Sequence, residues 1–232
     1  MTEAIPAETI RVLDHGFVRL DGVLADDLSV ANAARVSFAR HKEAMDESDE
    51  GLIRFLLRER HGTPFEHNSF RFHVRCPLFV AREWFRHRIG SFNEFSMRYA
   101  RATDDFYVPE PEDVRTQVGK PGSYSFEPVD DELAERTRAE LQDVYDHAYA
   151  TYERLVEAGV ARELARCVLP VGAYTEFYWT VNARALMNFV SLRAAETAQR
   201  EIRRYADAVE TFLAEHMPVT HAAFVANDRT AP

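Results

Sequence analysis

Residues 68–76, NSFRFHVRC, alternate between apolar and polar side chains along most of their length. Phe70, Phe72 and Val74 would lie on one side of an extended chain, with two arginines and a histidine on the other. This period of two predicts a β-strand with one face buried and one face towards solvent. The chain therefore needs a sheet that is packed on one face.

The remaining strands and helices follow one another in an irregular order. The segments IRVLD, GFVRLDGVLAD and VGAYTEFYWTV have the apolar, β-branched or aromatic character of strands. Helical spacing predicts helices over DDLSVANAARVSFAR, ESDEGLIRFLLRERHG, PLFVAREWFRHRI, residues 131–158, ARELARCVLP, NARALMNFVSLRA and AETAQREIRRYADAVETFLAEHM. The order is too irregular for a doubly wound sheet. We assign the α+β class, with a mixed or antiparallel sheet flanked by helices, some of them long.

Local signals predict where the first three helices begin and end. Asp26 or Asp27 would cap the first helix. Ser48 would cap the second, and Gly62, just past its end, would stop it. Pro77 is placed for the first helical position of the third.

The second half of the chain begins with a less regular region. Residues 103–130 are rich in proline, glycine and charge, which predicts a long loop that could move. The long helix after this loop would end at Gly159, and the last two helices would separate near residues 194–195. We expect a single domain over residues 1–232, with short flexible tails.

The net charge and the lack of long apolar stretches argue against some classes of partner and location. The 232-residue chain has a formal net charge of −10, so we expect neither a general nucleic-acid binder nor a binder of anionic membranes. An anionic ligand would need a local cluster of arginine or lysine. The N-terminus lacks the pattern of a signal peptide, and no apolar stretch approaches transmembrane length. The default location is the cytoplasm.

The cysteines and histidines give little support for a disulfide framework or a metal site. The two cysteines, Cys76 and Cys167, lie in apolar sequence surroundings, where structural burial is the usual interpretation. His61 and His67 have a spacing that hints at a metal, but no third ligand pattern supports one. We therefore predict no metal site.

One segment, RHRIGSFNEFSMRYA at residues 86–100, concentrates positive charge and aromatic rings. Arg86, His87 and Arg88 are consecutive, so at a helix end they would fan out by about 100° per residue and could reach more than one anionic group. An isolated run of this kind is more often a helix end that interacts with the helix dipole and nearby carboxylates. The glycine-rich nucleotide motifs are absent, as are G-x-S-x-G and H-E-x-x-H.

The end of the same segment offers donors and acceptors for a nucleotide. If it is extended, Glu94, Ser96 and Arg98 share one side. Together they suit a base, a ribose or a phosphate. The Ser96 hydroxyl could act as a nucleophile only beside a positioned base, and no such base is evident in the sequence.

The pattern R-H-R-x7-S, formed by Arg86, His87, Arg88 and Ser96, is the signature of the flavin-dependent thymidylate synthases, and the chain resembles that family well beyond this motif. The resembling segments, in chain order, are HGTPFEH, FRFHVR, FVAREWFRHRIGSFNEFSMRY, RELARCVLP, TVNARALMNF and SLRA. The resemblance extends from about residue 10 to residue 218.

The resemblance implies methylation of dUMP to dTMP. 5,10-Methylenetetrahydrofolate would supply the carbon, FAD would carry hydride to the pyrimidine, and NADPH would reduce the flavin. It also implies a homotetramer whose active sites are each built from several subunits, with the flavin held without a Rossmann fold. The motif serine would bind nucleotide rather than attack it.

The resemblance also assigns roles to individual residues. The cofactor-binding residues would be Thr63, Arg86, His87, Arg88, Glu94, Asn182, Arg184 and Asn188. The substrate-binding residues would be Glu83, Arg86, Glu94, Phe95, Ser96, Met97, Arg98, Arg166 and Arg193. Among these, Arg166 would contact the phosphate. Arg193 would be catalytic, because it would lie over the uracil and polarise the base.

Two of these assignments leave alternatives open. Arg193 continues a helical stripe through Leu186 and Phe189, where an arginine must reach the surface, pair or bind a ligand. Compensation of the helix dipole at a C-terminus is an equally good interpretation. Glu83 stands where many family members have glutamine, and its carboxylate would repel a phosphate unless an arginine neutralises it.

Two other functions compete with this one. A cysteine-dependent thymidylate synthase would need Cys76 or Cys167 as its nucleophile. A non-catalytic nucleotide- or flavin-binding assembly protein could keep the same scaffold. Flavin absorbance in the purified protein would favour the flavin-dependent enzyme over the non-catalytic protein.

Overall fold

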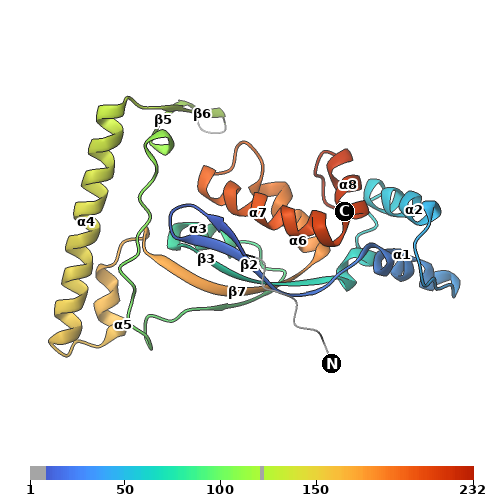
Figure 1. Cartoon of the computed structure of the whole chain (residues 1–232), viewed down its shortest axis with the longest axis horizontal. Helices are drawn as coiled ribbons and strands as arrows, with labels where there is room; N and C mark the ends of the chain where they lie inside the picture. Colours follow the sequence, from blue (N-terminus) through green and yellow to red (C-terminus); the bar gives the residue numbers. More distant parts are fainter. Residues whose placement is uncertain (1–8, 121–122) are drawn as a thin grey trace.

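A five-stranded antiparallel sheet forms the centre of the fold (Figure 1). The computed structural model describes residues 9–120 and 123–232. The strand order is β1–β2–β3–β7–β4, and each neighbouring pair is antiparallel. The strands are β1 (Thr9–Val12), β2 (Gly16–Leu24), β3 (Ser69–Pro77), β4 (Ser91–Glu94) and β7 (Tyr174–Asn182). The predicted α+β class is confirmed.

Three helices, α3 (Leu78–Trp84), α6 (Ala183–Arg193) and α7 (Arg200–His216), cover one face of this sheet. Phe70, Phe72 and Val74 of β3 are fully buried beneath them, whereas Arg71 is exposed on the other face, as the alternation predicts. Figure 1 shows no helix of the described chain against that other face. The helices are α1 (Asp27–Arg35), α2 (Glu47–Arg58), α3 (Leu78–Trp84), α4 (Asp131–Glu157), α5 (Arg162–Ala165), α6 (Ala183–Arg193), α7 (Arg200–His216) and α8 (Pro218–Ala226).

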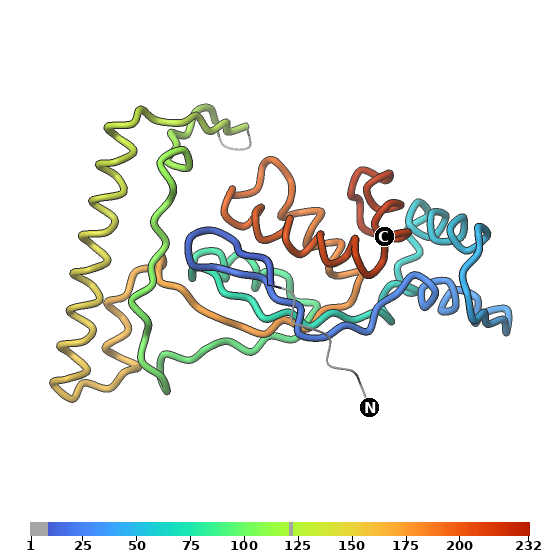
Figure 2. The backbone as a smooth tube through the Cα atoms, in the orientation of Figure 1, coloured from blue at the N-terminus to red at the C-terminus, as the bar shows by residue number. Residues whose placement is uncertain are grey.

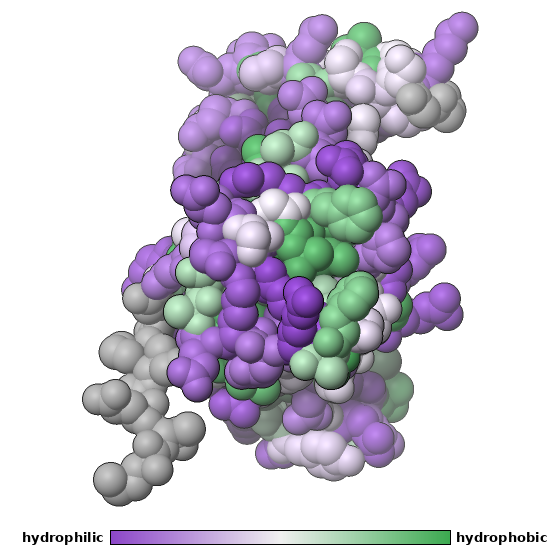
Figure 3. Space-filling view, turned by 90° about the vertical axis from the view of Figure 1, so that its right-hand side faces the viewer, coloured by the Kyte–Doolittle hydropathy of each residue, from purple (hydrophilic) through white to green (hydrophobic). Residues whose placement is uncertain are grey.

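At one end of the sheet, α1, α2 and α8 form a packed group, which Figure 2 shows beside the C-terminal end of the chain. The buried carboxylate of Asp27 accepts the backbone N–H groups of Val219 and Thr220, both at 2.8 Å, at the start of α8. Figure 3 views this end of the molecule and shows a hydrophobic area within a mostly hydrophilic surface. Exposed apolar side chains on or beside α1 and α2 include Val36, Phe38 and Phe55.

The opposite end consists of α4, α5 and a hairpin of β5 (Arg115–Lys120) and β6 (Ser123–Pro128) (Figure 1). Of the 27 residues of α4, only Ala134, Tyr145 and Tyr152 are buried. Both hairpin strands are almost entirely exposed. These elements therefore bury little surface against their own chain.

Several predicted boundaries agree with the structure. Asp26 caps α1, and its carboxylate accepts the backbone N–H of Ser29 at 2.6 Å. The long helix α4 ends just before Gly159, which has a φ of 86° in the left-handed region that favours glycine. The last two predicted helices separate after Arg193, as expected, although α7 begins at Arg200 rather than at the predicted residue 195.

The predicted ends of the second helix are wrong. Asp46, not Ser48, caps α2: the Asp46 carboxylate accepts the N–H of Ser48, and the Asp49 carboxylate accepts the N–H of Asp46, each at 2.9 Å. This capping box stabilises the earlier start. The helix also stops before Gly62, and Arg60 takes the left-handed conformation with a φ of 59°.

Two further expectations are wrong, and two elements were missed. Pro77 is the last residue of β3 and the extended N-cap of α3, with ψ 148°, rather than its first helical residue. Residues 103–130 are not a loop throughout, because they contain the β5–β6 hairpin, whose exposed strands lack a buried apolar pattern. The short strand β4 and the final helix α8 were not predicted.

Among the described residues, no helix is both long and apolar enough to cross a bilayer.

Candidate active site

Helix α3 ends at Trp84, earlier than the predicted end at Ile89, so Arg86, His87 and Arg88 follow it outside the helix and lie beside α6. The fully buried indole of Trp84, at the end of α3, stacks on Phe189 of α6 with 4.6 Å between ring centroids. His87 packs edge-on against the same phenylalanine at 4.9 Å. This aromatic packing holds the basic segment against α6.

The start of α6 brings a second set of predicted residues to the same place. Asn182 ends β7 and caps α6, and its side-chain oxygen accepts the N–H of Ala185 at 2.8 Å. Arg184 and Asn188, one turn apart, are both exposed, and Arg193 is the last residue of the helix. The end of β7 and helix α6 therefore position four predicted site residues on the side of α6 that faces the basic segment.

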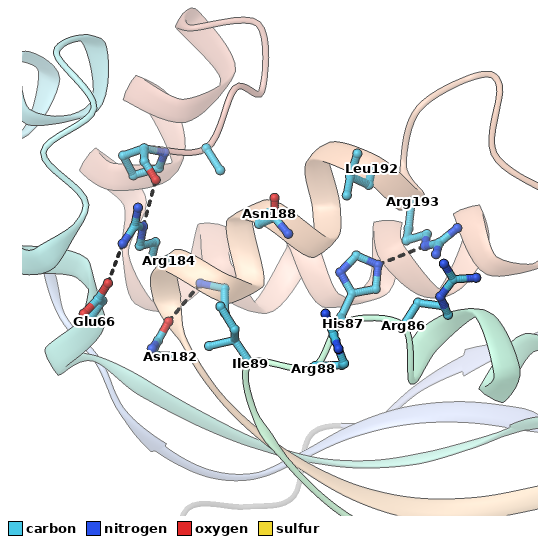
Figure 4. Close-up of a pocket in the computed structure, with 13 residues that line it drawn as sticks. Glu66, Arg86, His87, Arg88, Ile89, Asn182, Arg184, Asn188, Leu192 and Arg193 are labelled. Carbon is cyan, nitrogen blue, oxygen red and sulfur yellow. Dashed lines mark hydrogen bonds and ion pairs between the residues drawn. The ribbon is translucent and has the colours of Figure 1, made fainter.

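The two segments line a cavity of 790 Å³ (Figure 4). The predicted site residues that line it are Arg86, His87, Arg88, Asn182, Arg184, Asn188 and Arg193. The lining residues that the sequence reasoning missed are Glu66, Ile89, Ala185, Leu192, Ala231 and Pro232. Glu66 belongs to the quoted segment HGTPFEH and Ile89 follows the basic run, so both could have been included. The other four carry no recognisable local signal.

The cavity wall is rich in cationic groups. Arg86 and Arg88 are exposed, and neither has an ion-pair partner within residues 9–120 and 123–232. Arg184 pairs with Glu66 through Nη1 at 2.5 Å and donates from Nε to the carbonyl oxygen of Pro232 at 2.9 Å. Exposed guanidinium groups without a carboxylate partner suit phosphate or carboxylate ligands.

Gly62 has a role near this cavity rather than at a helix end. A Cβ atom at this position would lie 2.3 Å from Nε of Arg184. Any other residue would displace the guanidinium, so the absence of a side chain lets Arg184 approach the backbone there.

Arg193 is bound to the end of α3. Its guanidinium donates to Oε2 of Glu83 at 3.0 Å, to the backbone oxygen of Glu83 at 3.1 Å and to Nε2 of His87 at 3.0 Å. Burial, together with the positive charge of Arg193, lowers the pKa of His87 to about 4, so the ring is neutral and Nε2 can accept. Burial raises the pKa of Glu83, while Arg193 opposes the shift. The arginine that neutralises Glu83 is thus Arg193.

Thr63 lies outside this cavity. It lines a separate hollow of 360 Å³ beside α1, together with His61 and His67. Within the part of the chain that the structure describes, no group of three or more histidine, cysteine, aspartate or glutamate side chains is placed to hold a metal ion.

Glu94 and Ser96 lie in a different environment from the arginine-rich wall. The Glu94 carboxylate accepts the hydroxyl of Thr175 at 2.8 Å. The chain turns at Ser96, whose hydroxyl accepts the N–H of Arg98 at 3.3 Å. The expectation of an extended segment with Glu94, Ser96 and Arg98 on one side is therefore wrong.

The residues after Ser96 belong with α4 and α5. Arg98 pairs with Glu163 of α5 at 3.1 Å, and Met97 is buried in a cluster with Tyr152 of α4. Phe95 is exposed, and Arg166, which directly follows α5, is partly exposed. One chain thus holds the predicted site in separate parts, and the Glu94–Arg98 and Arg166 part does not line the 790 Å³ cavity.

The two cysteines differ in environment. Cys76 is fully buried in β3, and burial, with the nearby charge of Glu94, raises the pKa of its thiol well above the ordinary value. Cys167 is exposed, so the expectation of burial is wrong for this residue. The buried thiol is unsuited to nucleophilic attack, because the thiolate is the reactive form.

The fold and the cavity first define a class of protein. It is an α+β protein in which the end of one helix and the start of another present several guanidinium and amide groups to a shared cavity. Such a wall is suited to an anionic ligand of substantial size.

Comparison with known proteins gives the family. The family described as "Thymidylate synthase complementing protein" matches residues 20–219. Proteins named flavin-dependent thymidylate synthase include one from Thermotoga neapolitana, 48% identical over 218 residues, covering 93% of this chain and 94% of the relative. Another, from Thermosipho africanus, is 46% identical over 215 residues, covering 93% of each chain. The chain belongs to the flavin-dependent thymidylate synthase family.

A solved structure has a similar fold. The crystal structure of a UMP/dUMP methylase PolB from Streptomyces cacaoi, bound with 5-Br dUMP, has a TM-score of 0.89 and 44% sequence identity. The match covers 96% of this chain and 100% of that one. The same methylase bound with 5-Br UMP matches with a TM-score of 0.87 and 43% identity.

Proposed function

We propose that this chain methylates dUMP to dTMP, with 5,10-methylenetetrahydrofolate as carbon donor, FAD as hydride carrier and NADPH as reductant. One observation carries the proposal: the 790 Å³ cavity gathers the basic segment after α3 and the polar face of α6. Membership of the family supports the reaction, since the relatives are named for it.

The residues of the cavity fit a flavin dinucleotide. Arg86 and Arg88 offer guanidinium groups to a diphosphate, and Asn188 offers an amide to a polar ring edge. Ile89 and Leu192, 72% and 57% exposed, offer apolar surface to a planar ring system. A flavin bound there would supply hydride to the pyrimidine. No glycine-rich loop is needed, so the site would be independent of a Rossmann fold.

The other predicted residues suit the nucleotide. Glu94, Ser96 and Arg98 would bind dUMP, with Arg166 on its phosphate. Arg193 would donate to the uracil and stabilise the negative charge that develops on the ring as hydride arrives. Thr63 would reach the flavin from the separate hollow beside α1.

We also propose a homotetramer with active sites shared between subunits. Within one chain, the Arg98 and Arg166 region lies beside α5, whereas Arg86 and Arg193 lie at α3 and α6. A site that needs both sets could be completed by groups from a neighbouring subunit. The largely unburied helix α4 and the exposed apolar side chains near α1 and α2 supply surface for such contacts.

Assembly should be required for flavin binding, because Thr63 and Glu94, two of the predicted flavin contacts, do not line the cavity within one chain. Sedimentation equilibrium should give the mass of four chains, and flavin should be released as the protein dissociates on dilution. The measurement is flavin content against oligomer mass over a dilution series. A stable monomer with a full complement of FAD would contradict the shared site.

The test of the reaction is product analysis after anaerobic incubation with dUMP, methylenetetrahydrofolate and NADPH. We expect dTMP and tetrahydrofolate, and no product when the flavin has been removed. A parallel incubation with UMP is needed, because the similar methylase is described as acting on UMP or dUMP. A folded, flavin-loaded protein that methylates neither nucleotide would refute the proposal.

Neither cysteine should be essential. The buried Cys76 has a raised thiol pKa, and no base is placed to activate the exposed Cys167 among its described contacts. Replacing both by alanine should leave dTMP formation largely intact, with a small loss of stability from the cavity at Cys76. Complete loss of activity in a folded, flavin-loaded double variant would instead favour the cysteine-dependent mechanism.

A further inference from the structure

Three acceptors in residues 83–87 bind the guanidinium of Arg193. Nη1 donates to the Glu83 carboxylate at 3.0 Å, Nη2 to the Glu83 backbone oxygen at 3.1 Å, and Nε to Nε2 of His87 at 3.0 Å. Each guanidinium nitrogen therefore has one acceptor. Figure 4 shows His87 and Arg193 facing one another on the cavity wall.

These contacts leave part of the guanidinium available. The group carries five N–H donors, so one N–H on each terminal nitrogen has no acceptor among the described residues. These two N–H groups remain available to donate to acceptors on a ligand. The contacts with Glu83 and His87 therefore orient the arginine without using all its donors.

We propose that Glu83 is a positioning residue: together with His87 it holds the Arg193 guanidinium so that the two remaining N–H groups face the uracil of the substrate. This inference rests on the proposed function. It replaces the direct nucleotide contact that the family resemblance assigned to Glu83. The carboxylate acts through Arg193 and need not touch the nucleotide.

Partial burial strengthens the ion pair between Glu83 and Arg193. The side chains of Glu83 and Arg193 are 27% and 21% exposed, so water screens their attraction less than in a surface pair. A free arginine at a helix end would have to lose side-chain entropy each time it engaged a ligand. A guanidinium that is already oriented avoids that cost in the transition state.

The ionisable groups around Glu83 determine how its contact with Arg193 should depend on pH. Arg193 faces it from α6, His87 from its own segment and Glu201 from α7. The Glu201 carboxylate in turn accepts hydrogen bonds from Tyr107, Arg115 and Gln199. Burial raises the pKa of Glu83 above its ordinary value of 4.5, Arg193 opposes this, and Glu201 adds to it. The hold on Arg193 should weaken as pH falls through that raised pKa.

The test is single-turnover oxidation of reduced flavin by dUMP and methylenetetrahydrofolate in the holoenzyme. Glu83→Ala should lower the rate about tenfold, with little change in dUMP affinity. Glu83→Gln keeps a hydrogen-bond acceptor, so its rate should fall less than that of Glu83→Ala. Because glutamine does not titrate, the rate of this variant should also lack the fall at acid pH. In an Arg193→Ala background, Glu83→Ala should add nothing, because nothing remains to be positioned. Glu50→Gln, which changes an exposed pair with Arg54 on α2, is the matched control.

Three outcomes would overturn the positioning role. They are a wild-type rate for Glu83→Ala, losses that add in the double variant, and a loss confined to nucleotide affinity. If Glu83→Ala loses flavin or fails to assemble, the test is made with Glu83→Gln instead. A pH–rate profile of this variant with the same fall at acid pH as wild type would count against the proposal. Failure of the proposed function looks different, because wild-type holoenzyme itself would then form no product.

Discussion

Arg193→Ala is expected to slow methyl transfer by a hundredfold or more, equivalent to about 3 kcal/mol of transition-state stabilisation. The guanidinium stays charged and presents a planar fork of donors, so it can stabilise negative charge that spreads over the uracil as hydride reaches the ring. The loss of dUMP affinity should be smaller than the loss of rate. Lysine should rescue only in part, because a point charge cannot reproduce the planar fork.

The measurement for Arg193→Ala is single-turnover oxidation of reduced flavin at saturating dUMP and methylenetetrahydrofolate. The variant should still form the tetramer, retain its flavin and allow NADPH to reduce it when dUMP is bound. Arg54→Ala, an exposed arginine on α2 with a carboxylate partner, is the matched control. A wild-type rate for Arg193→Ala would leave the residue with a role in binding or at the helix end only.

Trp84→Ala should lower the free energy of unfolding by about 3–5 kcal/mol, the usual range for a buried tryptophan. Trp84 is fully buried and contacts the rings of Phe177, Trp179 and Phe189. The substitution would leave a cavity between α3 and α6. Because Arg86 to Arg88 follow α3, the variant should also lose flavin.

Chemical denaturation at fixed protein concentration, followed by circular dichroism, measures the effect of Trp84→Ala. A fixed concentration is needed because the stability of an oligomer depends on it. Val171→Ala is the control, since Val171 is 62% exposed and lies outside the proposed contact surfaces, so its truncation should change stability by less than about 0.5 kcal/mol. A loss of similar size in both variants would show that the Trp84 cluster does not hold α3 against α6.

Elements with a strong local pattern could be predicted from the sequence. The alternation around Phe72 predicts β3 and its buried face, and Gly159 predicts the end of the long helix just before it, because both signals depend on neighbouring residues alone. The β5–β6 hairpin was missed because its strands are exposed and bury no apolar face. Ser48 and Asp46 are both good caps, and the hydrogen bond from the Asp46 N–H to the Asp49 carboxylate favours Asp46.

The candidate site was predictable where one segment carries it. Arg184 and Asn188 share a helical face, so their common place on the cavity wall follows from the spacing. The contact of Arg193 with Glu83 depends on how α3 and α6 pack, which no local pattern encodes. The place of Ala231 and Pro232 on the cavity wall likewise depends on tertiary packing, because the C-terminal residues must fold back along α6 to line the cavity.

The most direct test of the central claim is to mix anaerobically reduced holoenzyme with dUMP and methylenetetrahydrofolate that is labelled at its methylene carbon. The flavin-dependent mechanism predicts one flavin oxidised for each dTMP formed, with the label in the new methyl group. No dTMP should form when the folate is omitted. Formation of labelled dTMP while the flavin stays reduced, or no dTMP at all from fully flavin-loaded protein, would contradict the account.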